Sequence, residues 1–249
     1  MKIQRLYPPP AREVSAVYED LDLLPPGHGD RARPYVALNM VSSVDGKVAI
    51  GGKTAGLGSK IDRQTMRTLR SRVDAVMIGA GTLRSEKLSL GLDQADTEAP
   101  LAIIVTETGH VPLEDHLVVK GEQEVLILLS EKALPGVAAR LGKLARVMKA
   151  PVDSRGAVDL GSALRALRAE RGIESLLVEG GPGLNHALIS RHLVDELFLT
   201  MAPELLGGTA SETLTLLRGP EIPAPDRLAL ELVSIHLADG ELFLRYSLA

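Results

Sequence analysis

A short apolar run in this chain ends in a glycine-rich turn, which limits the folds that the sequence can adopt. Residues 176–178 read Leu-Leu-Val, as in a buried strand, and Glu-Gly-Gly-Pro-Gly follows. Pro182 stands where a helix can begin, because N–H groups in the first helical turn have no partner within the helix and proline has no N–H to leave unpaired. Such a turn presents backbone N–H groups in the positive field of a helix dipole, which favours a phosphate. A tight turn without a ligand is the equal alternative for one motif of this kind.

A second run of the same kind lies earlier in the chain. Residues 74–78 are of strand length and are followed by Gly79-Ala80-Gly81-Thr82. This is not the Rossmann dinucleotide motif, because Arg84 takes the place of the third glycine, and no P-loop Lys-Ser pair follows. Two glycine-rich turns after two strands predict one extended ligand held at two points, and a dinucleotide has that length.

Strand and helix patterns alternate around these turns. Alternation predicts an α/β fold with a mostly parallel central sheet and helices on both faces. The turn Asp239-Gly240 joins the runs 228–237 and 241–248, which predicts a C-terminal antiparallel hairpin at one edge of the sheet. The other expected strands are 35–41, 73–78, 101–106, 125–129, 145–150, 176–178 and 197–201, and the expected helices are 59–72, 133–141, 160–170 and 184–191.

The first part of the chain differs in composition from the rest. Residues 1–33 carry prolines at positions 8–10 and at 25–26, with a short helix expected within 14–24. We expect an N-terminal Pro-rich arm, 1–33, that packs on one main domain, 34–249. The polar loops 84–100 and 202–227 are expected to border a site.

Composition excludes several functions. The 249 residues include no cysteine, which excludes disulfides, thiolate zinc sites and cysteine nucleophiles. The six histidines lack metal-ligand spacing, so no metal is expected. Only 2% of residues are aromatic and the net charge is −4, which argues against nucleic-acid binding. No hydrophobic signal core or membrane-length run is present, so we expect a cytoplasmic protein that acts on a small molecule.

Four blocks together resemble a known family. They are residues 39–47 (Asn-Met-Val-Ser-Ser-Val-Asp-Gly-Lys), 69–70, 74–82 and 178–181. They resemble the C-terminal reductase domain of the bacterial riboflavin-biosynthesis deaminase-reductase. The resemblance implies a dihydrofolate-reductase-like fold, NADPH as cofactor, and reduction of a ribosylaminopyrimidine phosphate to its ribitylamino form. It also favours a homodimer. The zinc deaminase half, which needs cysteine ligands, is absent from this chain, so a stand-alone reductase is expected.

The resemblance also implies cofactor-binding residues. The NADPH phosphates would lie at the turn after residue 178 and at the start of the next helix: Gly180, Gly181, Pro182, Gly183 and Leu184. Thr82, with Gly79 and Gly81 beside it, matches a further cofactor position, as do Thr106 and Val41. The alternatives are a helix N-cap for Thr82, a polar strand end for Thr106 and plain core for Val41. Arg84 is our own candidate for a clamp on the 2′-phosphate, although the sequence leaves NADPH and NADH open.

On the substrate side, Arg70 matches an arginine that grips the substrate phosphate, and its planar fork suits that role. The alternative is a solvated arginine on a helix face. Glu86, Leu90 and Glu179 match substrate-contacting positions, and Glu179 is the candidate catalytic residue. Glu179 would bind ribose hydroxyls, and either Glu179 or a bound water would deliver the proton. Asp45, in the Ser-Val-Asp-Gly block, is interpreted as a turn residue.

One departure from the family weakens the substrate assignment. Asp93 stands where the family carries a second arginine, and Arg84 or Lys87 is the candidate replacement. Two other functions therefore stay open. One is an NADPH reductase of the same fold that acts on another pyrimidine or a pteridine. The other is a nucleotide-binding protein without catalysis.

Overall fold

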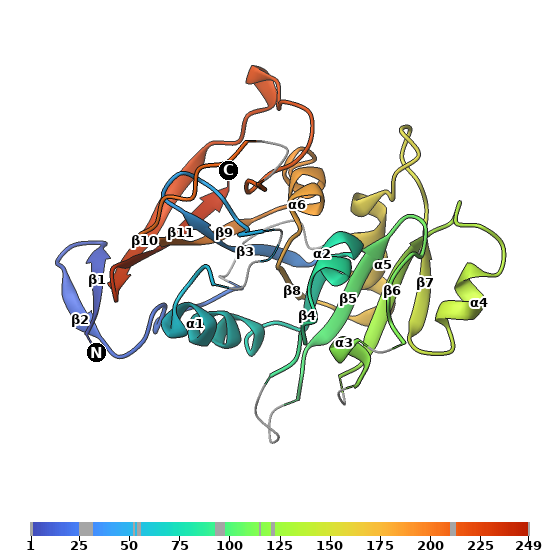
Figure 1. The fold of residues 1–249 in the computed structure, drawn as a ribbon, viewed down its shortest axis with the longest axis horizontal. Coiled ribbons are helices and arrows are strands. Elements are labelled where there is room, and N and C mark those ends of the chain that lie inside the picture. Colours follow the sequence, from blue (N-terminus) through green and yellow to red (C-terminus); the bar gives the residue numbers. More distant parts are fainter. Residues whose placement is uncertain are drawn as a thin grey trace. The chain divides into compact units, whose positions relative to one another are not determined.

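In the computed structural model the chain folds into two compact units (Figure 1). The first comprises Met1–Gly27, Val36–Leu69 and Pro182–Ala249, and the second comprises His28–Tyr35 and Arg70–Gly181. The structure describes residues 2–24, 32–51, 53, 56–92, 98–114, 116–120, 123–209 and 213–248.

The second unit is built on parallel strands in the order β8-β4-β5-β6-β7. Every residue of β6 and β8 is buried, as expected for parallel strands with covered faces. The strands are β4 (Ala75–Gly79), β5 (Leu101–Thr106), β6 (Val125–Ser130), β7 (Arg146–Ala150) and β8 (Ser175–Val178). Because the strands are parallel, the turns after β4, β5 and β8 share one end of the sheet.

Short helices connect these strands. The chain steps in one direction from β4 to β7, and the long helix α5 carries it back to β8. A right-handed crossover therefore places α5 on the face opposite α2 and α3 (Figure 1). Helix α5 begins at the N-cap Asp159, which accepts from Ser162 N, and ends at Gly172 in the left-handed region. The helices are α2 (Ala80–Ser85), α3 (Leu117–Lys120), α4 (Val137–Leu141) and α5 (Leu160–Arg171).

The first unit contains strands in the order β2-β1-β10-β11-β9-β3. The β3–β9 pair is parallel and the other pairs are antiparallel. The strands are β1 (Ile3–Tyr7), β2 (Arg12–Val14), β3 (Tyr35–Ser43), β9 (Glu196–Ala202), β10 (Leu230–Ala238) and β11 (Glu241–Leu248). The helices are α1 (Lys60–Arg70), α6 (Pro182–Ile189) and the 3-10 turn η1 (Ala224–Asp226), and Arg70 at the end of α1 opens the second unit.

The α/β class and the C-terminal hairpin are confirmed. Asp239 and Gly240 both have positive φ, at 53° and 81°, as a tight hairpin turn requires. Ser59 caps α1 as expected, because its Oγ accepts from Ile61 N at 3.0 Å. The ends of the helices and strands differ from the expected bounds by a few residues. For example, α4 begins at Val137, whereas the expected helix begins at residue 133.

Two expectations are wrong. The N-terminal arm forms strands β1 and β2, and no helix lies between residues 14 and 24. The C-terminal hairpin of β10 and β11 is also not at a sheet edge, because β1 pairs with the outer side of β10. Beyond β2, the segment is held by Tyr18, whose buried ring packs edge-on against Phe198 and whose hydroxyl donates to Leu244 O. These contacts are distant in sequence, so the local pattern could not show them.

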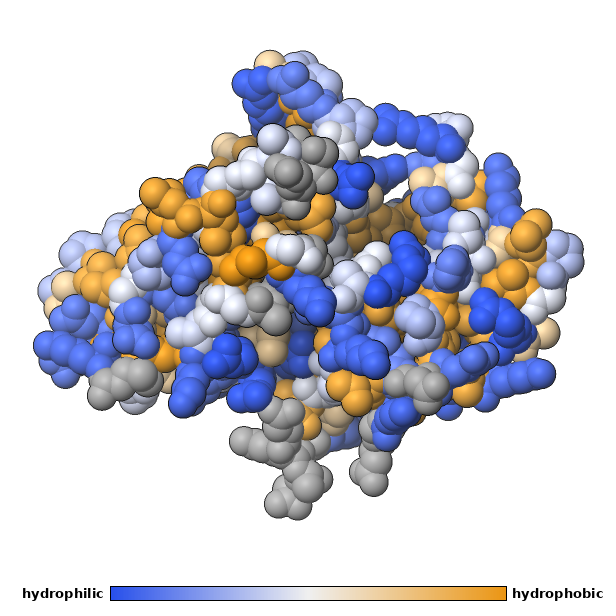
Figure 2. Space-filling model, in the orientation of Figure 1, coloured by the Kyte–Doolittle hydropathy of each residue, from blue (hydrophilic) through white to orange (hydrophobic). Residues whose placement is uncertain are grey.

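The surface is mixed in character. In the face that Figure 2 shows, hydrophilic residues are spread widely with hydrophobic residues between them. Within the part of the chain that the structure describes, no helix is both long enough and apolar enough to cross a membrane.

Candidate active site

The two predicted glycine-rich turns meet. Gly79 N donates to Gly180 O at 2.8 Å. A Cβ built on Gly181 would lie 2.9 Å from Thr82 Oγ1, closer than side-chain carbons approach other atoms. A larger residue at position 181 would therefore displace the Thr82 hydroxyl. The turns after β4 and β8 thus form one continuous backbone surface.

The turn after β8 is compact and needs glycine. Gly180 has a φ of 86°, in the region that favours glycine, and the Gly180–Gly181 peptide is cis. Pro182 then begins α6, as its position in the sequence predicts. Within that helix Gly183 is exposed, Leu184 is half-buried, and a Cβ on Gly183 would meet nothing within 4 Å.

The segment after β4 is a helix rather than a loop. Gly79 ends β4 and is the N-cap of α2, so Thr82 lies in the first helical turn and is not the cap. Thr82 is half-buried, and its Oγ1 makes no hydrogen bond to the residues that the structure describes. This hydroxyl is therefore free to bind a ligand beside Gly181.

Glu179 is held by Arg70. Arg70 Nε donates to Glu179 Oε1 at 2.8 Å, and Arg70 Nη2 donates to Oε2 at 2.6 Å. The side chains are 7% and 11% exposed, so a solvated helix-face arginine is the wrong interpretation of Arg70. We call Arg70 and Glu179 the buried pair. Its bidentate geometry fixes the plane of the carboxylate.

Arg70 also holds the loop that follows α2. Its Nη1 donates to Ser89 O and to Gly91 O, both at 3.1 Å. Between these two carbonyls, Leu90 is fully buried, so its side chain is part of the core. Asp93, the departure from the family pattern, lies outside the described residues.

The remaining substrate-side residues lie close by in sequence. Glu86 is half-buried at the end of α2, where its N–H donates to Thr82 O. Its backbone carbonyl lies 2.7 Å from His116 Nε2. Lys87 is exposed. These positions place a carboxylate and an ammonium group just beyond the helix that carries Thr82.

Two predicted cofactor residues are engaged with the segment after β5. Thr106 is buried, and its Oγ1 accepts from Gly109 N at 3.0 Å, which shapes a turn. Arg84 is exposed, and its Nη1 donates to His110 O at 2.9 Å. The geometry thus gives Thr106 a role as a polar strand end and leaves part of the Arg84 guanidinium facing solvent.

In the first unit, Val41 is half-buried in β3 and is paired with Thr200 of β9. Asp45, just after β3, anchors a loop that the sequence did not connect to it. Its carboxylate accepts from Ser43 Oγ at 2.6 Å and from the N–H groups of Leu206 and Gly207. These hydrogen bonds, that of Ser43 foremost, lower the pKa of Asp45 to about 2.

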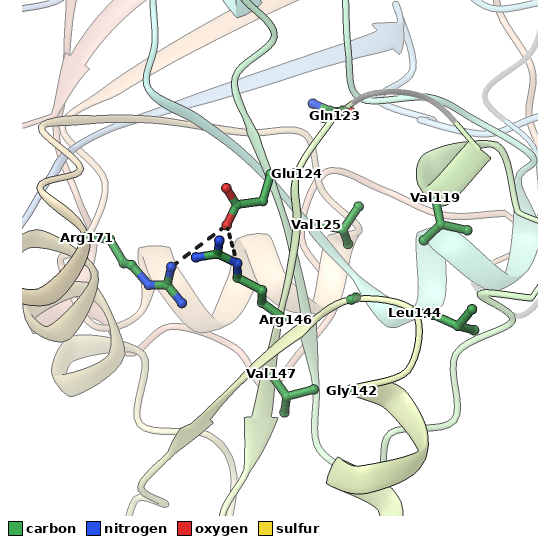
Figure 3. Close-up of a pocket in the computed structure, with 10 residues that line it drawn as sticks. Val119, Gln123, Glu124, Val125, Gly142, Leu144, Arg146, Val147 and Arg171 are labelled. Carbon is green, nitrogen blue, oxygen red and sulfur yellow. Dashed lines mark ion pairs between the residues drawn. The ribbon is translucent and has the colours of Figure 1, made fainter.

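A hollow of about 680 Å³ lies at the opposite end of the second unit's sheet (Figure 3). It is bordered by the amino ends of β6 and β7 and by the last turn of α5. Glu124 Oε1 lies 3.1 Å from Arg146 Nε and 3.8 Å from Arg171 Nη1. We call these residues the exposed trio, because the Arg146 and Glu124 side chains are exposed and the half-buried side chain of Arg171 is still 29% exposed. The apolar side chains of Val119, Leu144 and Val147 lie away from them in the same hollow (Figure 3).

A model of the RibD C-terminal domain matches residues 34–243. The chain belongs to the RibD C-terminal domain family. A curated relative from Methanothermobacter thermautotrophicus, named 2,5-diamino-6-ribosylamino-4(3H)-pyrimidinone 5′-phosphate reductase, is 31% identical over 86% of this chain and 98% of its own length. The reductase of the same name from Aquifex aeolicus is 33% identical over 73% of this chain and 82% of its own.

The fold is that of RibD structures. Acinetobacter baumannii RibD superposes with a TM-score of 0.72 at 21% identity, over 88% of this chain and 58% of that one. The expected family and the expected fold class are therefore confirmed. As its curated relatives are named reductases, the chain belongs with oxidoreductases of riboflavin biosynthesis.

Proposed function

We propose that this chain is an NADPH-dependent reductase that converts the ribosyl group of a ribosylaminopyrimidine 5′-phosphate to ribityl. The observation that carries the proposal is the meeting of the two glycine-rich turns beside Glu179. The names of the curated relatives supply the substrate class. We further propose that the enzyme acts as a homodimer in the cytoplasm.

The turns fit a dinucleotide phosphate. Gly181 carries no side chain, which lets Thr82 Oγ1 lie directly beside the backbone of the turn after β8. Thr82 Oγ1 would donate to a phosphate oxygen, and the N-terminal end of α6, with Pro182, Gly183 and Leu184, would favour its negative charge. Gly79 and Gly81 precede Thr82 in the same glycine-rich turn.

Other cofactor assignments are secondary. Arg84 would contact a 2′-phosphate with the part of its guanidinium that faces solvent, and this contact would select NADPH over NADH. Thr106 would contribute through its hydroxyl hydrogen, since the oxygen already accepts from Gly109 N. Val41 would contribute through its backbone. When bound, NADPH supplies the hydride.

The reaction needs an electrophilic sugar carbon. The ribosylamine opens to an imine, one hydride adds to C1, and one proton reaches the nitrogen, so the product gains two electrons and two hydrogen atoms. Glu179 would bind ribose hydroxyls and hold C1 in line, while Glu86 would contact the substrate from the end of α2. The chain thus contributes position and exclusion of water.

The test is loss of NADPH absorbance on addition of the phosphorylated ribosylaminopyrimidine, with its dephosphorylated form and dihydrofolate in parallel. We expect turnover of the phosphorylated compound. Glu179→Gln should lower kcat about 100-fold, in the range of a lost catalytic group. NADPH affinity should stay within about threefold of the wild type, because the turns do not depend on the carboxylate charge.

Two outcomes would redirect the proposal. Equal losses of turnover and NADPH binding in Glu179→Gln would reassign Glu179 to the cofactor site. NADPH binding with turnover of a pteridine or of another pyrimidine alone would favour a same-fold reductase of different substrate, which Asp93 in place of an arginine already suggests. NADPH binding without any turnover would indicate a non-catalytic nucleotide-binding protein.

A further inference from the structure

A segment beyond β9, residues 213–220, lies along helix α6, and we call it the strap. Arg218 N donates to Pro182 O at 3.0 Å, so the strap reaches the first residue of the helix. One turn further on, Asn185 is fully buried, and its Nδ2 donates to Leu216 O at 3.0 Å. The first turns of α6 therefore hold the strap through both backbone and side-chain groups.

His186, on the same helix, has the tightest fit to the strap. Its Nε2 lies 2.7 Å from Pro220 O, and because a carbonyl oxygen can only accept, this nitrogen carries the proton. Gly219 lies against the same ring, and a Cβ built on it would overlap His186 Nδ1 and Cγ. The φ of Gly219 is outside the left-handed region, so a side chain there is opposed by the imidazole ring and not by such strain.

The other end of the strap is fixed to the residues that follow β3. Val48 N donates to Leu214 O at 2.9 Å, and Lys47 forms an antiparallel bridge with Thr215. Val48 is itself buried. Because the strap is held at both ends within the first unit, it cannot shift along α6 without breaking one of these two sets of contacts.

The strap holds a particular part of α6. The C-terminal half of the helix is anchored by the buried side chains of Leu188 and Ile189. The contacts of the strap are instead at Pro182, Asn185 and His186, in the N-terminal half. The N–H groups of a first helical turn bind an anion best when the helix end is already held in the binding position, since no ordering is then needed.

We propose that the strap, through the fit of His186 against Gly219, positions the N-terminal end of α6 for the cofactor phosphate. His186 is thus a positioning residue, because it acts through the helix and does not touch the reacting atoms. This inference rests on the proposed function, in which that end of α6 receives a phosphate of NADPH. It adds a pair of residues that sets cofactor affinity and leaves the chemical step alone.

Binding of NADPH, followed by its fluorescence, tests the pair. Gly219→Ala should weaken binding at least about fivefold, because the new methyl group displaces the imidazole or the strap and the helix end is no longer held. His186→Ala should weaken binding at least about threefold. In the His186→Ala background, Gly219→Ala should weaken binding by less than about twofold more, because the ring that it collides with is gone.

Two more variants test whether the hydrogen bond of His186 is what matters. His186→Gln keeps an N–H donor near the position of Nε2 and should bind NADPH within about twofold of the wild type. His192→Ala is the matched control, because His192 is exposed just beyond the end of α6, and it should also stay within about twofold. If Gly219→Ala does not fold, as judged by circular dichroism, equal affinities of His186→Ala and His186→Gln would overturn the inference.

Steady-state kinetics extends the test to the reaction. Gly219→Ala should raise KM for NADPH at least about fivefold and leave kcat, and KM for the pyrimidine, within about twofold. A purely structural role would lower the amount of active enzyme, and thus kcat, without raising KM for NADPH. That result, or an equal effect of Gly219→Ala with and without His186, would overturn the positioning role.

The outcomes also separate this inference from the proposed function. A wild type that binds NADPH but reduces no pyrimidine would overturn the proposed function alone, and the binding data would still decide the role of His186. A wild type that reduces the pyrimidine, with Gly219→Ala binding NADPH as tightly, would overturn the inference alone. A wild type that does not bind NADPH would overturn both.

Discussion

The two ends of one sheet carry the same kinds of side chain in different surroundings. At the carboxyl end, the buried pair of Arg70 and Glu179 has side chains that are 7% and 11% exposed. At the amino end, Glu124 and Arg146 of the exposed trio are 47% and 63% exposed. In the buried pair, carbonyls and the carboxylate satisfy the guanidinium, whereas water can solvate the trio. Burial therefore decides which arrangement can impose a geometry on a reacting group.

The first prediction removes the cation of the buried pair. Arg70→Met should lower the free energy of unfolding by about 3 kcal/mol, because it leaves a buried carboxylate without a partner. Urea denaturation followed by circular dichroism measures the effect. Replacing both residues with Met should recover at least half of the loss. A loss below about 1 kcal/mol would show that the pair behaves like a surface pair, and the comparison would fail.

The second prediction concerns the tightness of the same end of the sheet. Gly181→Ala should lower the free energy of unfolding by roughly 1 kcal/mol, because the new Cβ forces Thr82 Oγ1 out of its place. Gly183→Ala is the matched control, since a Cβ there meets nothing within 4 Å. In a Thr82→Ala background, the cost of Gly181→Ala should fall by at least half. If Gly181→Ala lowers the free energy of unfolding by the same amount in the Thr82→Ala background, contact with Thr82 Oγ1 is not the cause of the loss.

The third prediction concerns the exposed trio and has the smallest expected effect. Arg146→Met should change the free energy of unfolding by no more than about 0.5 kcal/mol, as is usual for exposed ion pairs. The difference should shrink further in 0.5 M salt, measured by the same denaturation. A loss as large as that of Arg70→Met would mean that burial is not what separates the two ends.

The sequence predicts the second unit well, because its strands other than β7 are apolar runs bounded by turns. It misses β1 and β2, since β1 pairs with the distant strand β10 and β2 pairs with β1. It also predicts α2 as a turn, because Gly79 and Gly81 suggest a loop although the helix begins at Ala80.

The sequence identifies the residues of the candidate site better than it identifies the contacts between them. The glycines and Glu179 stand out because they follow apolar runs. The partnership of Arg70 with Glu179 spans 109 positions, and no local pattern reports it. The same limit applies to Leu90, which matches a ligand contact in the family but is fully buried here.

The strand β1 has a consequence beyond the architecture of the first unit. Without it, the stretch Ile235–Ala238 of β10 would present unpaired N–H and C=O groups at the edge of the sheet, a template for pairing with other chains. With the arm in place, the outermost strand is β2, which is three residues long and carries Arg12 and Glu13. Short charged edges resist such pairing. We therefore expect loss of the arm to cause aggregation during expression and storage before it changes catalysis.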